Sequence, residues 1–346
     1  QPGTATTALC FPTDRDQYDH GAGSHMSTSQ ATFAFVQTLA AELSHQEFDI
    51  PPFPDVAIRI RDAMNNPNVT THDIAKIITA DPVLTTRLLR MANSALLRRG
   101  PIEITDINVA IGRLGFDLVR NTVVSLAMDT TFAAGNANAE VRKYIDAVRT
   151  HSTHVCALAY ILAKRQSSME NPEEVMLTGL LHDIGKFYIL NRANDFPELF
   201  GEPEQLNDLL ATWHTGVGRA IIESWGFPVH IAEAIDEHET LGRYQPGSPD
   251  MTDIVLVANL FVNLHENPPD ELPDLSEIPA CKKMAINHEV MEGIMHASED
   301  DIRSIEQALG GSGTKHPAPP PPPPPGGAKR GREELNKVGD VNPPGV

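Results

Sequence analysis

The sequence predicts an all-α protein built from two helical lobes. Apolar residues recur at spacings of three and four from about residue 31 to about residue 309, which is the period of helices with one buried face. No apolar–polar alternation of strand length appears, and no Asn-Gly turn lies between two such runs. Aromatic residues make up 5% of the chain and hydrophobic residues 41%, so Leu, Ile, Val, Ala and Met must build most of the core.

Two segments flank this helical region, which we expect to run from residue 26 to residue 309. Residues 1–25 show no period, and Gly23-Ser24-His25-Met26 is typical of the remnant of a cleaved tag, so we expect Met26 to be the natural start. After Gly310 the composition changes, and the proline run Pro319–Pro325 predicts an extended polyproline II segment. We interpret residues 310–346 as a disordered tail, with a docking peptide for a groove-binding partner as the alternative reading of Pro319–Pro325.

Turn and cap residues divide the helical region into elements. Thr70–Asp73 forms a polar cap before the apolar run at Ile74, and Asp81 precedes a first-turn proline, Pro82. Gly100-Pro101 and Gly115 interrupt the pattern as turn residues do. The loose stretch Ala133–Asn138 separates the expected lobes, which run from about residue 31 to 133 and from about residue 140 to 309.

Charge and composition exclude several classes of protein. The net charge of −19 repels phosphate backbones and anionic lipid headgroups, so nucleic acid is not the expected main partner. No run of 18 apolar residues predicts a membrane span, and no signal peptide precedes the helical region. Three widely spaced cysteines, Cys10, Cys156 and Cys281, predict neither a disulfide framework nor a cysteine zinc site. Together these features favour a cytoplasmic protein.

Five polar residues fall on faces that should be buried. In the helix expected from about residue 140 to 165, His151 shares the face of the apolar residues, whereas His154 lies at its rim. The adjacent pair His182-Asp183 sits inside an apolar run that predicts the middle of the next helix. His214 and His238 lie on the apolar faces of two later helices. Any one could be a satisfied core residue, but together they predict a shared cluster, either hydrogen-bonded or holding a divalent metal.

The order of several motifs resembles one family. The arrangement of His151, His182-Asp183 and a later polar position is similar to the HD superfamily of metal-dependent phosphohydrolases. The finer resemblance is to its signalling offshoot, the HDOD domain (HD-related output domain), over about Glu47 to Met295. The segments that carry it are Phe48–Pro54, Ile77–Leu84, Leu88–Ser94, Ala110–Gly115, His151-Ser152, Gly179–Lys186, His214–Pro228 and Ala234–His238.

This resemblance implies an all-helical, two-lobed domain whose second lobe is an HD-like bundle. It also exposes departures from the catalytic pattern. Asn259 stands where the superfamily's last metal-binding aspartate is expected, and an amide lacks the charge that holds a divalent ion. Related cyclic-dinucleotide phosphodiesterases have two adjacent histidines and a Gly-Tyr-Pro element, whereas this chain has His238-Glu239 and no such element.

We therefore expect a bacterial signalling or regulatory output module that acts through protein–protein interaction. Its partners would be signalling proteins in trans, its HD-type site would be degenerate, and no cofactor is expected. The first alternative is a phosphohydrolase acting on a nucleotide or cyclic dinucleotide. It would bind Mn, Fe, Zn or Ni through His151, His182 and Asp183, with His214 and His238 as further candidate ligands, and would use Asp183 and Lys186 in catalysis. For Lys186 itself, we favour the interpretation of a solvated lysine at a helix end over a catalytic role. The second alternative is a domain that senses a nucleotide without hydrolysing it.

Overall fold

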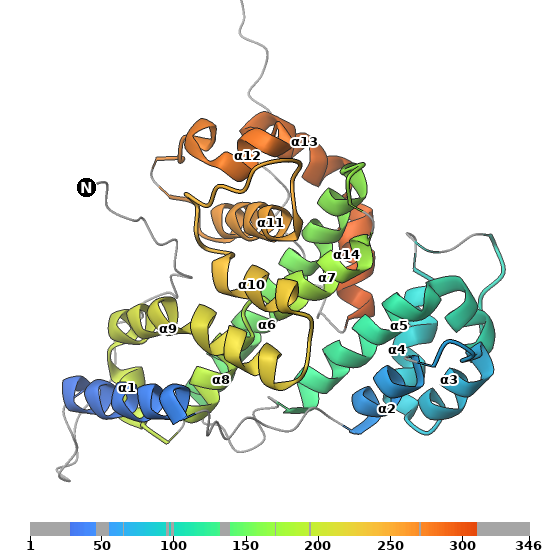
Figure 1. The fold of residues 1–346 in the computed structure, drawn as a ribbon, viewed down its shortest axis with the longest axis horizontal. Coiled ribbons are helices and arrows are strands. Elements are labelled where there is room, and N and C mark those ends of the chain that lie inside the picture. Colours follow the sequence, from blue (N-terminus) through green and yellow to red (C-terminus); the bar gives the residue numbers. More distant parts are fainter. Residues whose placement is uncertain are drawn as a thin grey trace, which may run out of the picture. The chain divides into compact units, whose positions relative to one another are not determined.

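The protein is described by a computed structural model over residues 28–45, 55–64, 66–94, 97, 100–131, 139–169, 171–193, 195–269 and 271–309. Every regular element in these ranges is a helix, which confirms the predicted all-α class (Figure 1). The elements are α1 (Thr28–His45), α2 (Asp55–Met64), α3 (Thr71–Ile78), α4 (Pro82–Ala92), α5 (Ile107–Thr131), α6 (Ala139–Arg165), α7 (Pro172–Leu181), α8 (Ile184–Ala193), η1 (Pro197–Gly201), α9 (Pro203–Ser224), α10 (Val229–Glu237), α11 (Met251–Glu266), η2 (Leu275–Glu277), α12 (Pro279–Met284), α13 (His288–Ala297) and α14 (Glu299–Ala308).

By its contacts the chain divides into residues 1–313 and residues 314–346, and all the described residues belong to the first unit. The expected leader (1–25), the expected tail (310–346) with its proline run, and the loose stretch at residues 133–138 lie outside the described residues. Those expectations remain predictions.

The first lobe is formed by α2, α3, α4 and α5, which pack on one another. Its helices begin where the sequence predicts. Thr70 and Asp73 form a reciprocal capping box at α3, and the Asp81 side chain accepts hydrogen bonds from the backbone N–H groups of the first turn of α4. At the end of α4, Asn93 donates to the carbonyls of Leu89 and Ile104 and accepts from the N–H of Ile104. This amide therefore fixes the link between α4 and the segment that leads to α5.

Helix α5 is interrupted at Gly115. The residue has φ of 78° and ψ of 163°, a conformation that residues with a side chain rarely adopt. The sequence predicts a break at this glycine, and the structure shows it as a kink inside one long helix.

The second lobe is a helical bundle around α6, which packs against α7, α8 and α11. The sequence places this helix at about 140–165, and the structure places it at Ala139–Arg165. Helices α8, α9, α10 and α11 then follow as consecutive packing neighbours. This bundle is the lobe that the sequence predicts to be HD-like.

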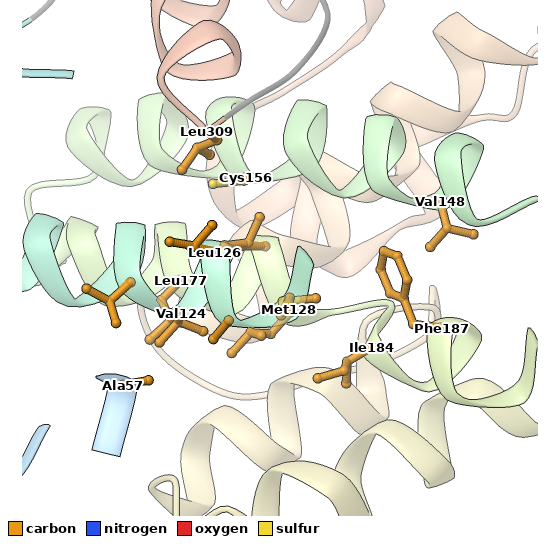
Figure 2. Close-up of a cluster of buried hydrophobic side chains, with 14 of the residues drawn as sticks. Ala57, Val124, Leu126, Met128, Val148, Cys156, Leu177, Ile184, Phe187 and Leu309 are labelled. Atoms are coloured by element: carbon orange, nitrogen blue, oxygen red, sulfur yellow. The ribbon is translucent and has the colours of Figure 1, made fainter. Parts of the chain in front are cut away.

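The two lobes share one hydrophobic core. Figure 2 shows side chains from the end of α5 next to side chains of α6, α7 and α8, together with the first residue after α14. The labelled members are Ala57, Val124, Leu126, Met128, Val148, Cys156, Leu177, Ile184, Phe187 and Leu309, and all are buried. Helix α14 also joins the lobes, because it contacts both α4 and α6.

Helix α1 packs on the second lobe, although its position in the sequence suggests that it belongs to the first. The expected boundary assigns it to the first lobe, but it contacts η1 and α9 of the second lobe. Glu42 accepts a hydrogen bond from the Tyr188 hydroxyl at 2.8 Å and pairs with Arg192, and the Phe35 ring meets Phe196 edge to face. The apolar period of α1 shows that the helix has a buried face, but it carries no information about which lobe covers that face.

Cys156 and Cys281 are buried free thiols. Burial raises the pKa of both, to about 11 for Cys281, so neither is an activated nucleophile. Within the described residues, no helix combines the length and the hydrophobicity needed to cross a bilayer.

Candidate metal centre

The structure brings together the five polar residues that the sequence places on buried faces. His151 comes from α6, His182 and Asp183 lie between α7 and α8, His214 comes from α9, and His238 follows α10. All five are at most 1% exposed. The rings of His151, His182, His238 and His214 follow one another at centroid distances of 5.2, 4.9 and 5.2 Å.

One detail of the prediction is wrong, because His182 and Asp183 do not lie inside a helix. Helix α7 ends at Leu181 and α8 begins at Ile184, so the pair occupies the turn between them. Apolar residues continue on both sides of the pair, and no proline marks the turn. The structural signal is Gly185, where an added Cβ would lie 2.0 Å from the carbonyl oxygen of His214. The chain turns so that α8 can lie directly against the backbone of α9.

Three of the histidines are oriented by backbone carbonyls. The Nδ1 atoms of His182, His214 and His238 lie 2.7, 2.8 and 2.6 Å from the carbonyl oxygens of Gly179, Leu210 and Ile235. A carbonyl oxygen only accepts hydrogen bonds, so each Nδ1 carries the proton and donates it. In the neutral ring the Nε2 atom then presents its lone pair to the cluster, as in histidines that bind metals.

Asp183 is the centre of the cluster, and its two oxygens have different surroundings. Oδ2 accepts a hydrogen bond from the Lys186 ammonium at 2.9 Å. Oδ1 lies 3.5 Å from His214 Nε2 and 3.6 Å from His238 Nε2, and no described group donates a hydrogen bond to it. A buried carboxylate oxygen that faces two nitrogen lone pairs is unfavourable unless a proton or a cation lies between them.

The ionisation of these groups suits a cation. Burial lowers the pKa of His182 to about 4, and burial together with Lys186 lowers that of His214. Burial by itself would raise the pKa of Asp183, but the Lys186 ammonium, bonded to Oδ2, holds it well below its usual value. Neutral imidazoles and an ionised carboxylate are the forms in which these side chains bind metals.

His151 has a different environment. Its Nδ1 lies 2.9 Å from Glu266 Oε2, and its Nε2 lies 2.9 Å from Asn259 Oδ1. Burial would raise the pKa of Glu266, yet its hydrogen bonds with His151 and His154 lower it to about 2. His154, expected at the rim, has a side chain 12% exposed and also lies 3.3 Å from Glu306 of α14. Asn259 Oδ1 is thus hydrogen-bonded to Nε2 of His151, the ring nitrogen with which His151 would bind a metal.

Two groups of residues in the described part of the chain could hold a metal ion: His151, His182 and Asp183, or Asp183, His214 and His238. In the first group, Asn259 holds His151 Nε2, and Lys186 supplies a positive charge to Asp183 Oδ2. In the second, Asp183 Oδ1 and the two Nε2 atoms face one another with separations of 3.3 to 3.6 Å. The second group therefore fits a divalent ion better.

Sequence reasoning missed two features of the cluster. Lys186 is only 4% exposed and bonded to Asp183, so the favoured interpretation of a solvated lysine is wrong. Glu239, which follows His238, was read only as a missing histidine, but its Oε1 lies 3.4 Å from His214 Nε2. Lys186 follows the turn between α7 and α8, and Glu239 lies in the turn that ends α10. Helical periodicity does not extend across a turn, so it does not predict the direction of either side chain.

A small cavity of about 20 Å³ lies beside the cluster, between the end of α10 and α11. Its walls include His238, Glu239, Asn259 and Asn263, together with leucines of α11. A volume of this size holds about one water molecule or ion.

The HDOD domain family matches residues 50–241, more than half of the chain, and the protein belongs to this family. A solved structure from Shewanella amazonensis SB2B, provisionally described as a metal-dependent phosphohydrolase, is 24% identical with a TM-score of 0.67 and covers 81% of this chain and 99% of its own. An HDOD domain protein of unknown function from Geobacter sulfurreducens is 22% identical with a TM-score of 0.57, covering 81% and 99%. A provisionally described signal transduction protein from Marinobacter aquaeolei VT8 is 16% identical with a TM-score of 0.54, covering 82% and 69%.

A curated relative, an uncharacterized protein from Treponema pallidum (strain Nichols), is 24% identical over 249 residues, 68% of this chain. The chain spans 47% of the length of that relative. At these identities the solved structures establish the fold: a two-lobed helical domain with an HD-like second lobe.

Proposed function

We propose that the protein is a regulatory module of a signalling pathway, that it acts by binding partner proteins, and that its HD-like lobe contains a closed metal centre without hydrolytic activity. The observation that supports a closed metal centre without hydrolytic activity is the burial of the cluster. His182, Asp183 and His214 are 0% exposed, and the adjoining cavity measures about 20 Å³. Pockets that bind drug-sized or nucleotide-sized ligands have volumes of about 300–1,000 Å³.

Asn259 supports the same conclusion. In place of an anionic ligand it contributes an amide that holds His151, so the His151 side of the cluster is a hydrogen-bonded structure. Asp183, His214 and His238 would hold a divalent ion on the other side, where the ion would supply the positive charge that Asp183 Oδ1 lacks. The His and Asp side chains would then tie together α8, α9 and α10.

A turnover assay tests this proposal. Full-length protein loaded with Mn²⁺, Fe²⁺, Zn²⁺ or Ni²⁺ is incubated with cyclic dinucleotides, nucleoside triphosphates and a chromogenic phosphodiester, and Asp183→Ala protein serves as the control. We expect no release of phosphate or mononucleotide above that control, because no substrate reaches the buried cluster. Metal-dependent turnover that Asp183→Ala abolishes would contradict the proposal.

The second candidate is a phosphohydrolase. It is favoured by the Lys186 ammonium beside Asp183, which could stabilise charge on a phosphate, and by the similarity to the Shewanella amazonensis structure. Calorimetric titration with the same cyclic dinucleotides separates hydrolysis from sensing, since binding heat without turnover would support the nucleotide-sensing alternative.

The partners are proposed to be signalling proteins that meet this chain in trans. The proline run Pro319–Pro325 remains a second proposal for a contact, with an aromatic-lined groove on the partner.

A further inference from the structure

Glu239, the residue after His238, lies close to His214 and His238, the two histidines that also face Asp183. Glu239 lies in the turn that ends α10, at the wall of the small cavity, and its side chain is 16% exposed. Its Oε1 lies 3.4 Å from His214 Nε2 and 3.9 Å from His238 Nε2. Asp183 Oδ1 lies 3.5 and 3.6 Å from the same two nitrogens. Two carboxylate oxygens thus share one pair of imidazole nitrogens.

We propose that Glu239 is a metal ligand, and that it completes a four-coordinate centre with Asp183, His214 and His238. This inference rests on the metal centre of the proposed function and names the residue that closes it. The lone pairs of both histidines face the shared point, because their Nδ1 protons are donated to Leu210 and Ile235. The two Nε2 atoms are 3.3 Å apart, so one ion can contact both.

The spacing of the ligand atoms of Asp183, His214 and His238 matches a tetrahedral ion, and Glu239 lies close to the fourth position. Ligand bonds of about 2.0–2.2 Å in tetrahedral geometry place neighbouring ligand atoms about 3.3–3.6 Å apart. Four of the separations that involve a histidine nitrogen are 3.3, 3.4, 3.5 and 3.6 Å, which is this range. The fifth, from Glu239 Oε1 to His238 Nε2, is 3.9 Å, so Glu239 must move slightly toward His238 to complete the tetrahedron. Two histidines and two carboxylates at such spacing suit Zn²⁺, and Co²⁺ as its spectroscopic substitute.

The Glu239 side chain is partly exposed, so the position next to the two histidines can be reached from outside. The Lys186 ammonium, 3.8 Å from Glu239 Oε1 and 2.9 Å from Asp183 Oδ2, offsets part of the charge of two carboxylates. An ion would enter through the cavity that Glu239 lines, which makes this side chain both the last ligand and the cover of the site.

Titration of the metal-free full-length protein with Co²⁺ and Zn²⁺ tests the proposal. Four-coordinate Co²⁺ absorbs strongly in the visible range, so the spectrum reports the coordination number independently of any activity. The variants are Glu239→Gln, which keeps the shape and removes the charge, and Glu239→His, which supplies a nitrogen ligand. Glu233→Gln, at an exposed position on α10, the helix that leads to Glu239, is the matched control.

We expect wild-type and Glu233→Gln proteins to bind one Co²⁺ with the intense four-coordinate spectrum. Loss of a residue that only supports a ligand typically lowers metal affinity about 10- to 100-fold. Glu239→Gln should lose at least about tenfold and show a weaker, altered spectrum, whereas Glu239→His should retain binding with shifted bands. Wild-type affinity and spectrum in Glu239→Gln would overturn the proposal, and so would absence of Co²⁺ binding by the wild type. Turnover in the hydrolysis assay with these binding results unchanged would contradict only the proposed function.

Discussion

Replacing Lys186 by methionine should lower the free energy of unfolding of the metal-free protein by about 3–5 kcal/mol. The Lys186 ammonium is buried and bonded at 2.9 Å to Asp183, whose side chain is fully buried. Removing one partner of a buried ion pair leaves an uncompensated charge, which costs about that much. Urea unfolding in the presence of a chelator measures the effect.

The matched control is Lys76→Met, because Lys76 lies exposed on α3, and we expect a change within about 0.5 kcal/mol there. Addition of Zn²⁺ should restore part of the stability lost by Lys186→Met, since an ion bound at Asp183 supplies the missing positive charge. A loss of stability equal to that of Lys76→Met would contradict the account of Asp183 as a buried anion that needs a cation.

Replacing Gly185 by alanine should destabilise the protein by more than about 3 kcal/mol or prevent folding. A Cβ at this position would lie 2.0 Å from the His214 carbonyl oxygen and 2.8 Å from the Gly218 nitrogen. Both are backbone atoms of α9, so no side-chain rotation relieves the contact, and α8 and α9 must move apart. Thermal and urea unfolding measure the loss, and the same movement should weaken metal binding because it displaces His214.

Gly216→Ala is the control for this substitution. Gly216 lies on α9, two residues from His214, and an added Cβ there meets nothing within 4 Å. Alanine in a helix interior is favoured over glycine by about 0.8–1.0 kcal/mol, so this variant should be as stable as the wild type or more stable. If Gly185→Ala behaved like Gly216→Ala, the close packing of α8 on α9 would be wrong.

The sequence predicts most of the fold because the signals of this fold are local. The cap at Thr70, the cap at Asp81 and the span of α6 follow from side chains and spacings within one or two turns, and the structure agrees with each. The convergence of His151, His182, Asp183, His214 and His238 could be inferred because all five lie on buried faces, where isolated polar groups are costly.

What the sequence could not predict depends on contacts between distant segments. The turn at His182 and Asp183 lets Gly185 lie against the backbone of α9, and the sequence near the pair does not show which distant segment this glycine contacts. The placement of α1 on the second lobe depends on Glu42, Tyr188 and Arg192, which are far apart in the chain. The inward direction of Lys186 and Glu239 likewise could not be predicted, because helical periodicity is lost across the turns near them.

The departure at Asn259 has a different consequence from the one expected. The sequence suggested that an amide weakens a metal site centred on His151, His182 and Asp183. In the structure, Asn259 and Glu266 hold His151 from both sides, while Asp183 presents its free oxygen to His214 and His238. The Asp183 carboxylate thus lies between two parts of the cluster. The part around His151 is held by hydrogen bonds, and the part formed with His214 and His238 fits a cation.

We infer that one divalent ion binds between Asp183, His214 and His238. Elemental analysis of the full-length protein, purified without chelator, tests it most directly when His238→Ala and His151→Gln proteins are prepared in parallel. We expect about one equivalent of metal in the wild type and in His151→Gln, and little or none in His238→Ala. Metal that is lost in His151→Gln and kept in His238→Ala would place the ion on the other side of Asp183, and a wild type without metal after incubation with excess Zn²⁺ would contradict the claim.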